Sequence, residues 1–170
     1  MIRMKCYVTF FLCIFLIGCT GDDYYNLGIY EAKQGNHEKA VHYFTMAIEK
    51  NPKDNNAYFN RAYSQQLLGG KESKVIADYS KSLKLNPDDN EAYMNRGIVF
   101  MEIGKIDQAI SDYKKSIELV SDYSSAYLNL GNAYMMKKDL DSACLNWKKS
   151  LELGNEKVFN LIQSNCSKMP

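Results

Sequence analysis

Residues 93–97, Tyr-Met-Asn-Arg-Gly, carry a pattern that occurs four times in this chain of 170 residues. The pattern is a tyrosine, an asparagine two positions later, and a glycine or alanine two positions after that. The other copies begin at Tyr24, Tyr58 and Tyr127, so successive copies are 34, 35 and 34 residues apart. A fixed period of this size predicts stacked supersecondary units rather than one closed core.

Each unit has the pattern of two helices. In the third unit, apolar and aromatic residues recur at helical spacing over residues 90–103, and Gly104 then ends the helix because glycine adopts the left-handed turn without steric cost. A second helical pattern runs over residues 107–119, with Asp107 as its expected N-cap. Pro52 and Pro87 end the second helices of the first two units, since proline disfavours helix in the residue before it.

These residues resemble the tetratricopeptide repeat, and the resemblance covers residues 21–157. It implies an all-α fold, a right-handed α-solenoid of four helix-turn-helix repeats. The repeats are expected near residues 21–54, 55–89, 90–123 and 124–157. The second unit departs from the pattern because the turn that contains Gly69 and Gly70 has one extra residue, so we expect a looser turn there.

A C-terminal cap is expected over residues 156–166, where apolar residues recur at helical spacing after Gly154. A solenoid needs such a cap because its last apolar face is otherwise uncovered. Cys144 and Cys166 are the two thiols expected to remain in the mature chain. In an exported protein they either form a disulfide or stay as two buried thiols. A bond that closes a loop of about twenty residues would stabilise the fold by ~3 kcal/mol.

The N-terminal residues 1–18 are typical of an export signal. Arg3 and Lys5 precede an apolar stretch of about twelve residues, whereas a membrane span needs roughly twenty. Residues 16–19, Leu-Ile-Gly-Cys, resemble the lipobox of bacterial lipoproteins. The resemblance implies that Cys19 becomes the new N-terminus and carries fatty acids such as palmitate. Residues 19–23 would then form a tether and residues 24–166 the repeat domain. An uncleaved anchor and secretion without lipid are the alternatives.

The residues after Cys19 bear on location. Thr20 stands where an aspartate would retain an enteric lipoprotein at the inner membrane, which favours the outer membrane. We therefore expect a lipid-anchored protein of the bacterial cell envelope, on either the periplasmic or the surface side. Asp22 or Asp23 either caps the first helix or belongs to an acidic tag like those of surface lipoproteins in Bacteroidetes-type bacteria.

No pattern for catalysis, a metal or a cofactor is found in the sequence. His37 and His42 are five residues apart, do not share a helix face, and have no acidic or cysteine ligand that would complete a metal site. No glycine-rich phosphate loop is present, and no His-Asp arrangement lies near the thiols in the sequence. The net charge of +1 gives no electrostatic footprint for nucleic acid. We predict a protein that is not an enzyme and has no cofactor.

The candidate binding residues lie on the first helix of each unit. The four asparagines of the repeated pattern should form a row along the concave side: Asn26, Asn60, Asn95 and Asn129. An amide both donates and accepts hydrogen bonds, so the row could hold a peptide backbone without reading its side chains. Alternatively, the asparagines support packing between repeats. Flanking residues either line the groove or are buried between repeats, and the candidates for the groove wall are Phe59, Tyr63, Met94 and Ile98.

Two functions follow from these expectations. The first is a lipid-anchored scaffold or adaptor that binds a peptide or helix of a partner protein in the concave groove. Tetratricopeptide domains that clamp a C-terminal carboxylate carry lysine and arginine at the flanking places, and this chain has none there. The alternative is a self-assembling structural envelope lipoprotein, for instance a homodimer, with no peptide ligand.

Overall fold

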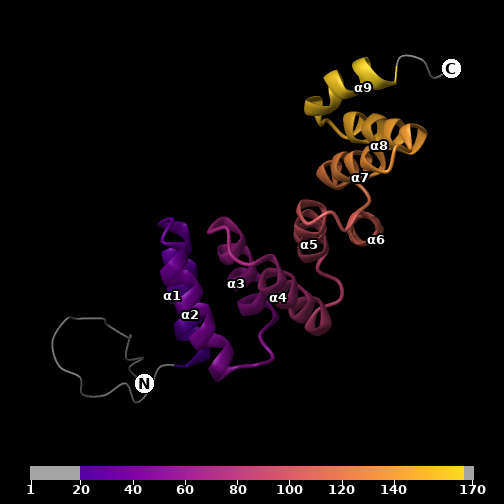
Figure 1. Cartoon of the computed structure of the whole chain (residues 1–170). Helices are drawn as coiled ribbons and strands as arrows, with labels where there is room; N and C mark the ends of the chain where they lie inside the picture. The colour runs from indigo at the N-terminus through magenta and orange to yellow at the C-terminus, as the bar shows by residue number, and fades with distance from the viewer. Residues whose placement is uncertain (1–19, 167–170) are drawn as a thin grey trace, which may run out of the picture.

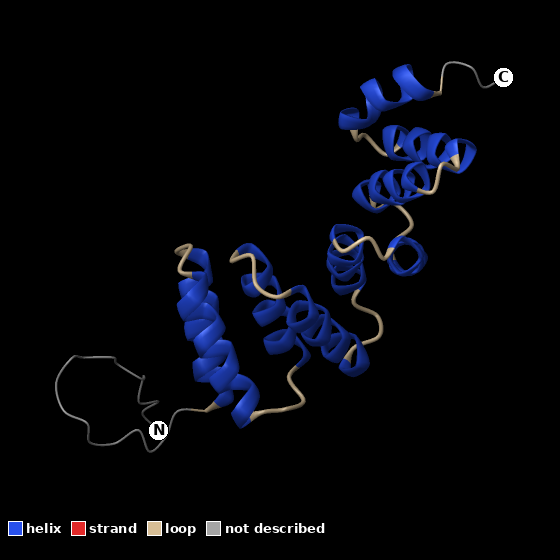
Figure 2. Cartoon of the chain, in the orientation of Figure 1, coloured by secondary structure: helices blue, strands red, loops and turns tan. Residues whose placement is uncertain are grey.

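The structure, a computed structural model, describes residues 20–166, and within this range it is helical without a strand. Figure 1 shows the order of the elements and Figure 2 their type. The helices are α1 (Gly21–Lys33), α2 (His37–Lys50), α3 (Asn55–Leu67), α4 (Glu72–Leu85), α5 (Asn90–Glu102), α6 (Ile106–Leu119), α7 (Ser124–Met136), α8 (Leu140–Glu152) and α9 (Phe159–Asn165), with a 3-10 turn at Glu156–Val158.

The helices pack as consecutive pairs. The first helix of each later pair also packs against the second helix of the pair before it, so α3 lies on α2, α5 on α4 and α7 on α6. The pairs follow a curved path, with α3 and α5 on its inner side and α4 and α6 on its outer side (Figure 1). The predicted all-α array of helix-turn-helix units with a C-terminal capping helix is confirmed.

Glycine lets the two helices of a pair approach closely. A Cβ atom on Gly28 would lie 2.5 Å from a ring carbon of Phe44, and one on Gly97 would lie 2.6 Å from the Tyr113 ring. Both distances are far below a normal carbon–carbon contact of about 3.5–4.0 Å. The small residue of the repeated pattern therefore makes room for the large aromatic residue of the facing helix.

A polar contact that the sequence analysis did not anticipate joins neighbouring repeats. The Arg96 guanidinium donates from Nε and Nη2 to both carboxylate oxygens of Asp112, each at 2.8 Å, and from Nη1 to Ser80 Oγ at 2.9 Å. Arg61 makes the same set of bonds to Asp78 and Thr45. Each arginine thereby links both helices of its own repeat to the second helix of the preceding repeat.

The terminal repeats lack this contact. At the two equivalent places the first repeat has Leu27 and Tyr43, and the fourth has Leu130 and Asn146. The array is thus held by an arginine–aspartate pair in its two middle repeats and by apolar or uncharged residues in its outer ones.

The expected N-cap of α6 was wrong, and the cap of α1 is shared, because Asp23 forms a capping box with Thr20. Helix α1 begins at Gly21, and its N-cap is Thr20, whose hydroxyl accepts a bond from the Asp23 backbone N–H at 3.3 Å while the Asp23 carboxylate accepts from the Thr20 N–H at 2.9 Å. Residues 21–23 therefore belong to the helix and not to a tether. Helix α6 begins at Ile106 after Lys105, and Asp107 in its first turn instead accepts from Lys137 Nζ at 2.6 Å. Residues 1–18 and Cys19 lie outside the described residues.

The turns inside the repeats are built in two ways. Gly35, Gly69 and Gly104 have φ near +70°, the left-handed region, and in the fourth repeat Lys138 takes this conformation with φ 63°. The turn between α3 and α4 has four residues, 68–71, whereas the other three have three, so the extra residue is present as expected.

The cap is joined to the last repeat by a disulfide between Cys144 on α8 and Cys166 after α9. Val158 and both cysteines are buried together with Trp147, and Leu161 and Ile162 pack against this cluster. The cap thus covers the apolar face of α8 that a fifth repeat would otherwise cover.

The Arg96–Asp112 pair provides a first test. The arginine and aspartate side chains are 18% and 7% exposed, so removing one partner leaves a charge that water reaches poorly. We expect Arg96→Leu to lower the free energy of unfolding by ~2–4 kcal/mol. The double variant Arg96→Leu/Asp112→Asn, which copies the residues of the fourth repeat, should be more stable than the single variant. Urea unfolding of the wild type, both single variants and the double variant measures this, and strictly additive effects would contradict it.

The disulfide provides a second test. It closes a loop with a sequence separation of 22, and its reduction should lower the free energy of unfolding by ~3 kcal/mol. Since α9 has only seven residues, its backbone amides should exchange much faster in the reduced protein. Hydrogen exchange with and without a phosphine reductant measures both effects, and α1 serves as the internal control. Equal protection of α9 in the two states would show that apolar packing alone holds the cap.

Candidate functional site

Helical geometry gives each first helix one solvent-facing stripe. Residues at positions i, i+4, i+7 and i+11 of an α-helix lie within a narrow arc, because each residue turns the chain by about 100°. With the patterned asparagine at the second position, this set forms what we call the inner stripe. Its members are Asp22, Asn26, Ile29 and Lys33 on α1; Asn56, Asn60, Tyr63 and Leu67 on α3; Glu91, Asn95, Ile98 and Glu102 on α5; and Ser125, Asn129, Asn132 and Met136 on α7.

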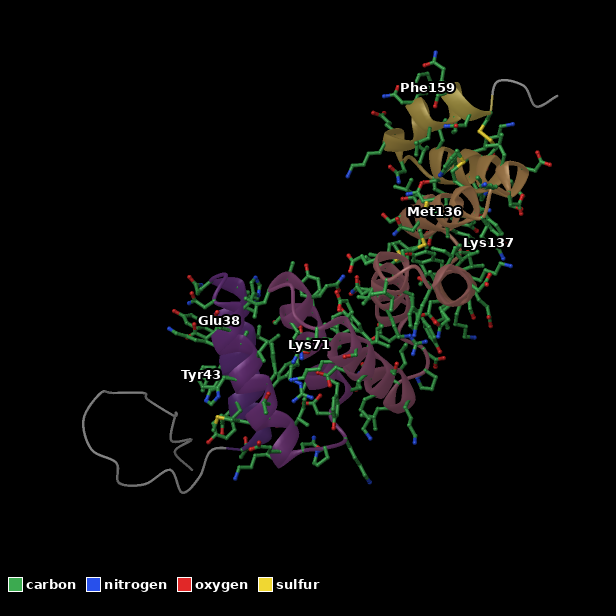
Figure 3. The ribbon with its side chains drawn as sticks, in the orientation of Figure 1. Glu38, Tyr43, Lys71, Met136, Lys137 and Phe159 are labelled. Carbon is green, nitrogen blue, oxygen red and sulfur yellow. A yellow bond between two sulfur atoms is a disulfide. The ribbon has the colours of Figure 1, made fainter. Side chains whose placement is uncertain are left out.

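The inner stripe is accessible in every repeat. Each of its members is at least partly exposed, whereas Ala57, Ala92 and Ala126, one position after the first stripe residue of their helices, are fully buried. Leu67 is 52% exposed and Met136, labelled at the end of α7 in Figure 3, is 66% exposed. The stripes of the four helices therefore form an accessible surface on the first helices of successive pairs, of which α3 and α5 lie on the inner side of the curve (Figure 1).

The four asparagines of the predicted row occupy the same stripe position on α1, α3, α5 and α7, and two of them also link neighbouring repeats. Asn60 Nδ2 donates to the Tyr25 hydroxyl at 3.2 Å and to the Asn56 carbonyl at 2.8 Å. Asn129 Nδ2 contacts Met94 Sδ of the preceding repeat at 3.7 Å. These contacts use the amide NH2 group, and a side-chain amide also carries a carbonyl oxygen that accepts hydrogen bonds. The side chains of Asn60 and Asn129 can thus link repeats through the NH2 group and still offer the carbonyl oxygen as a hydrogen-bond acceptor.

The four predicted groove-wall residues differ in exposure, and Ile98 packs in part against the core cluster that contains Met94. Tyr63 is 44% exposed and Ile98 is partly exposed, and both lie on the inner stripe. Met94 was wrongly placed in the groove wall, because it is only 4% exposed and packs in the core with Leu130. Phe59 is half-buried, with its ring centroid 5.7 Å from that of Tyr79. Both residues precede the asparagine by one position, which turns them about 100° away from the stripe.

The sequence analysis missed the ends of the stripe. The same periodicity predicts these ends when it is extended by one helical turn in each direction. The extension toward the start of the helix reaches Asp22 and Glu91, and the extension toward its end reaches Leu67 and Met136. The stripe is therefore polar at the start of each helix and, in α3 and α7, apolar at its end.

The charges of the stripe are mostly acidic. Asp22, Glu91 and Glu102 are exposed there, and Lys33 is its one cation. The arginines of α3 and α5 are paired with aspartates of α4 and α6 and add no free positive charge. The stripe residues of α3, α5 and α7 include no lysine or arginine.

A small hollow adjoins the stripe between the α3–α4 turn and α5. Its volume is about 80 Å³, and it is lined by Gln66, Gly69, Gly70, Glu72, Val75, Val99 and Glu102. The Tyr79 hydroxyl donates to Gln66 Oε1 at 3.0 Å, and burial raises the pKa of Tyr79, so the phenol remains a donor at neutral pH. At Gly70 a Cβ would lie 2.8 Å from the Gln65 carbonyl oxygen, so glycine is required there.

Residues 20–166 contain neither a metal-binding cluster nor a membrane-spanning helix. No group of three or more histidine, cysteine or acidic side chains that could hold a metal occurs there. Over the same residues, none of the helices has both the length and the apolar character needed to cross a bilayer.

Comparison with family models identifies the repeats. A model described as TPR repeat matches residues 99–138, and one described as tetratricopeptide repeat matches residues 22–54. A curated relative, an uncharacterized protein of Methanocaldococcus jannaschii, is 43% identical over 49 residues. This match covers 29% of the present chain and only 57% of that relative.

Solved structures share the fold at low sequence identity. A crystal structure of MamA has a TM-score of 0.76 at 24% identity and covers 82% of this chain and 81% of its own. MamA 41-end from Desulfovibrio magneticus RS-1 has a TM-score of 0.77 at 20% identity, covering 85% of this chain and 86% of its own. The first TPR of Spaghetti (RPAP3), bound to an HSP90 peptide, has a TM-score of 0.67 at 23% identity and covers 70% of this chain and 94% of its own. The family matches and the shared fold together show that the chain contains tetratricopeptide repeats.

Proposed function

We propose that this protein is a lipid-anchored adaptor that binds a peptide or helix of a partner protein along the inner stripe. Proteins built from such repeats are typically non-enzymatic scaffolds, and one of the similar structures holds a bound peptide. The observation that carries the proposal is the repetition of an accessible stripe on the first helix of four successive helix pairs. A surface that repeats with the fold suits an elongated ligand, because each repeat adds an equivalent contact.

The proposed anchor is Cys19, placed at the cell envelope, with the outer membrane favoured. The support is the lipobox-like stretch 16–19 and the basic and apolar residues before it. Since Thr20 is the N-cap of α1, at most one residue would separate a lipid on Cys19 from the first helix. An attachment this short would hold one end of the first repeat near the lipid headgroups. At this end α1 begins and α2 finishes, and Gly21 packs against Lys50 and Asn51.

The test of the adaptor is capture of a partner from membranes with the intact chain and with Asn60→Ala/Asn95→Ala. We expect capture to fall by at least about tenfold in the double variant, since both residues lie centrally on the stripe and central contacts dominate binding energy. The matched control is Leu145→Ala, which removes a 69% exposed side chain from α8, outside the stripe. Circular dichroism checks that the double variant keeps its fold. Equal capture by all three proteins would contradict a stripe-bound partner.

A second candidate function, self-assembly, has its own supporting observation. Tyr30 on α1 is 60% exposed, whereas the equivalent residues of the later repeats, Ser64, Val99 and Ala133, are buried against the preceding repeat. Within residues 20–166 no repeat precedes the first, and this face of α1 is exposed at Tyr30. A second copy could cover it.

Size measurement by light scattering tests this alternative on a chain that begins at Thr20, which keeps the N-cap of α1. A dimer formed through the α1 face should weaken when Tyr30→Ser is introduced, because the main exposed apolar side chain of that face is lost, and should be unaffected by Leu145→Ala. A monomer at all concentrations, or a dimer that ignores Tyr30→Ser, would rule out self-assembly through α1.

A further inference from the structure

The hollow beside the α3–α4 turn lies where the second repeat differs from the others in the length of its turn. The α3–α4 turn is the only one of the four such turns with an extra residue, and its glycines, Gly69 and Gly70, form one wall of the hollow. The hollow also borders Glu102, the last residue of the α5 stripe, and follows directly on Leu67, the last residue of the α3 stripe. It is therefore continuous with the surface proposed to bind a partner.

The lining has an apolar part and an acidic part. Val75 and Val99 are each 1% exposed and form the apolar part. Glu72 and Glu102 are exposed and form the acidic part, and neither makes an ion pair within residues 20–166. Lys71 and Lys105, in the adjoining turns, are exposed as well. A lysine or arginine side chain of a partner suits a lining of this kind. Its aliphatic stem can pack on the apolar part, while its charged head stays near water and the glutamates.

The size of the hollow fits a side chain better than a separate ligand. Small-molecule sites occupy about 300–1,000 Å³, several times the volume here. A hollow of about 80 Å³ has room for the end of one long side chain. On either side of it, the stripe offers exposed apolar contacts at Tyr63 and Leu67 of α3 and at Met136 of α7.

We infer that the partner segment presents a lysine or arginine flanked by apolar side chains, and that this cation enters the hollow between Glu72 and Glu102. The inference rests on the proposed function of the inner stripe and names the chemistry of its ligand. Charge complementarity supports it, because the stripe is acidic and α3, α5 and α7 supply it with no cation. Lys71 and Lys105 lie in the adjoining turns but are not part of the lining, whose charged residues are both glutamates, so an acidic side chain that entered the hollow would meet like charges.

The experiment uses three synthetic helical peptides of leucine and alanine that differ at one central position. That position holds lysine, norleucine or glutamate, so norleucine keeps the aliphatic stem and removes the charge. Fluorescence anisotropy measures their binding to the wild-type chain, to Glu72→Gln/Glu102→Gln and to Glu49→Gln. The last variant removes an exposed carboxylate from α2, which takes no part in the hollow.

We expect the lysine peptide to bind about three- to tenfold more tightly than the norleucine peptide, as for a partly shielded ion pair, and the glutamate peptide to bind most weakly. This preference should disappear in Glu72→Gln/Glu102→Gln, persist in Glu49→Gln, and shrink as salt is raised. Equal binding of the three peptides, binding of none of them, or a preference that survives in Glu72→Gln/Glu102→Gln would overturn the inference.

The adaptor proposal can fail separately. If a membrane partner is captured in an Asn60- and Asn95-dependent manner while the peptides show no preference for lysine, the stripe binds a ligand of different chemistry, and only the inference is lost. If capture does not depend on Asn60 and Asn95 but the lysine preference requires Glu72 and Glu102, the hollow is a cation site outside the proposed groove.

Discussion

The close approach of the two helices within each pair is the constraint on which the rest of the structure depends. In three of the four repeats a glycine faces an aromatic ring so closely that a Cβ would collide with it, as at Gly28 with Phe44 and Gly131 with Trp147. This contact sets the spacing of the pair and buries its largest side chains. Once the pair is set, its outer faces are set too, and the next pair can stack on it with the same geometry. The inner stripe is a consequence of that repetition, because it is the face of each first helix that stays at least partly exposed after the neighbouring helices have packed.

The polar contacts between repeats add specificity to a core that is otherwise made of apolar and small residues. Arg61 and Arg96 each satisfy an aspartate of their own repeat and a hydroxyl of the preceding one, so they favour a single register of stacking. The outer repeats replace these groups by Leu27 and Leu130. The same arrangement has a functional side: by neutralising the arginines, Asp78 and Asp112 leave the inner surface acidic, and the fold itself thereby influences which partners the surface can accept.

Most of the fold was predictable from the sequence because the information is periodic. Spacing of the Tyr-x-Asn-x-small pattern, the turn glycines and the prolines located the helix pairs, and family models match two of the repeats. Individual caps were harder, since Thr20 and Asp22 compete for the same role and only the observed hydrogen bonds decide between them. Within the candidate site, the equivalent positions of the four asparagines follow from the period of the pattern. The burial of Met94 was not, because a residue one position before the asparagine turns toward the next repeat, and that neighbour is 35 residues away in the chain.

The disulfide between Cys144 and Cys166 makes the two ends of this array unequal in stability. In a linear stack each repeat contacts only its neighbours, so thermal opening begins at the ends and spreads inward. Within residues 20–166, one end is closed by a covalent bond and a cap, whereas the other ends in the flank of α1, where Tyr30 is exposed. Fraying should therefore start at α1 and run toward the cap. If the chain is attached through Cys19, the end that opens first is also the end at the membrane, and the attachment would restrain the least stable part of the stack.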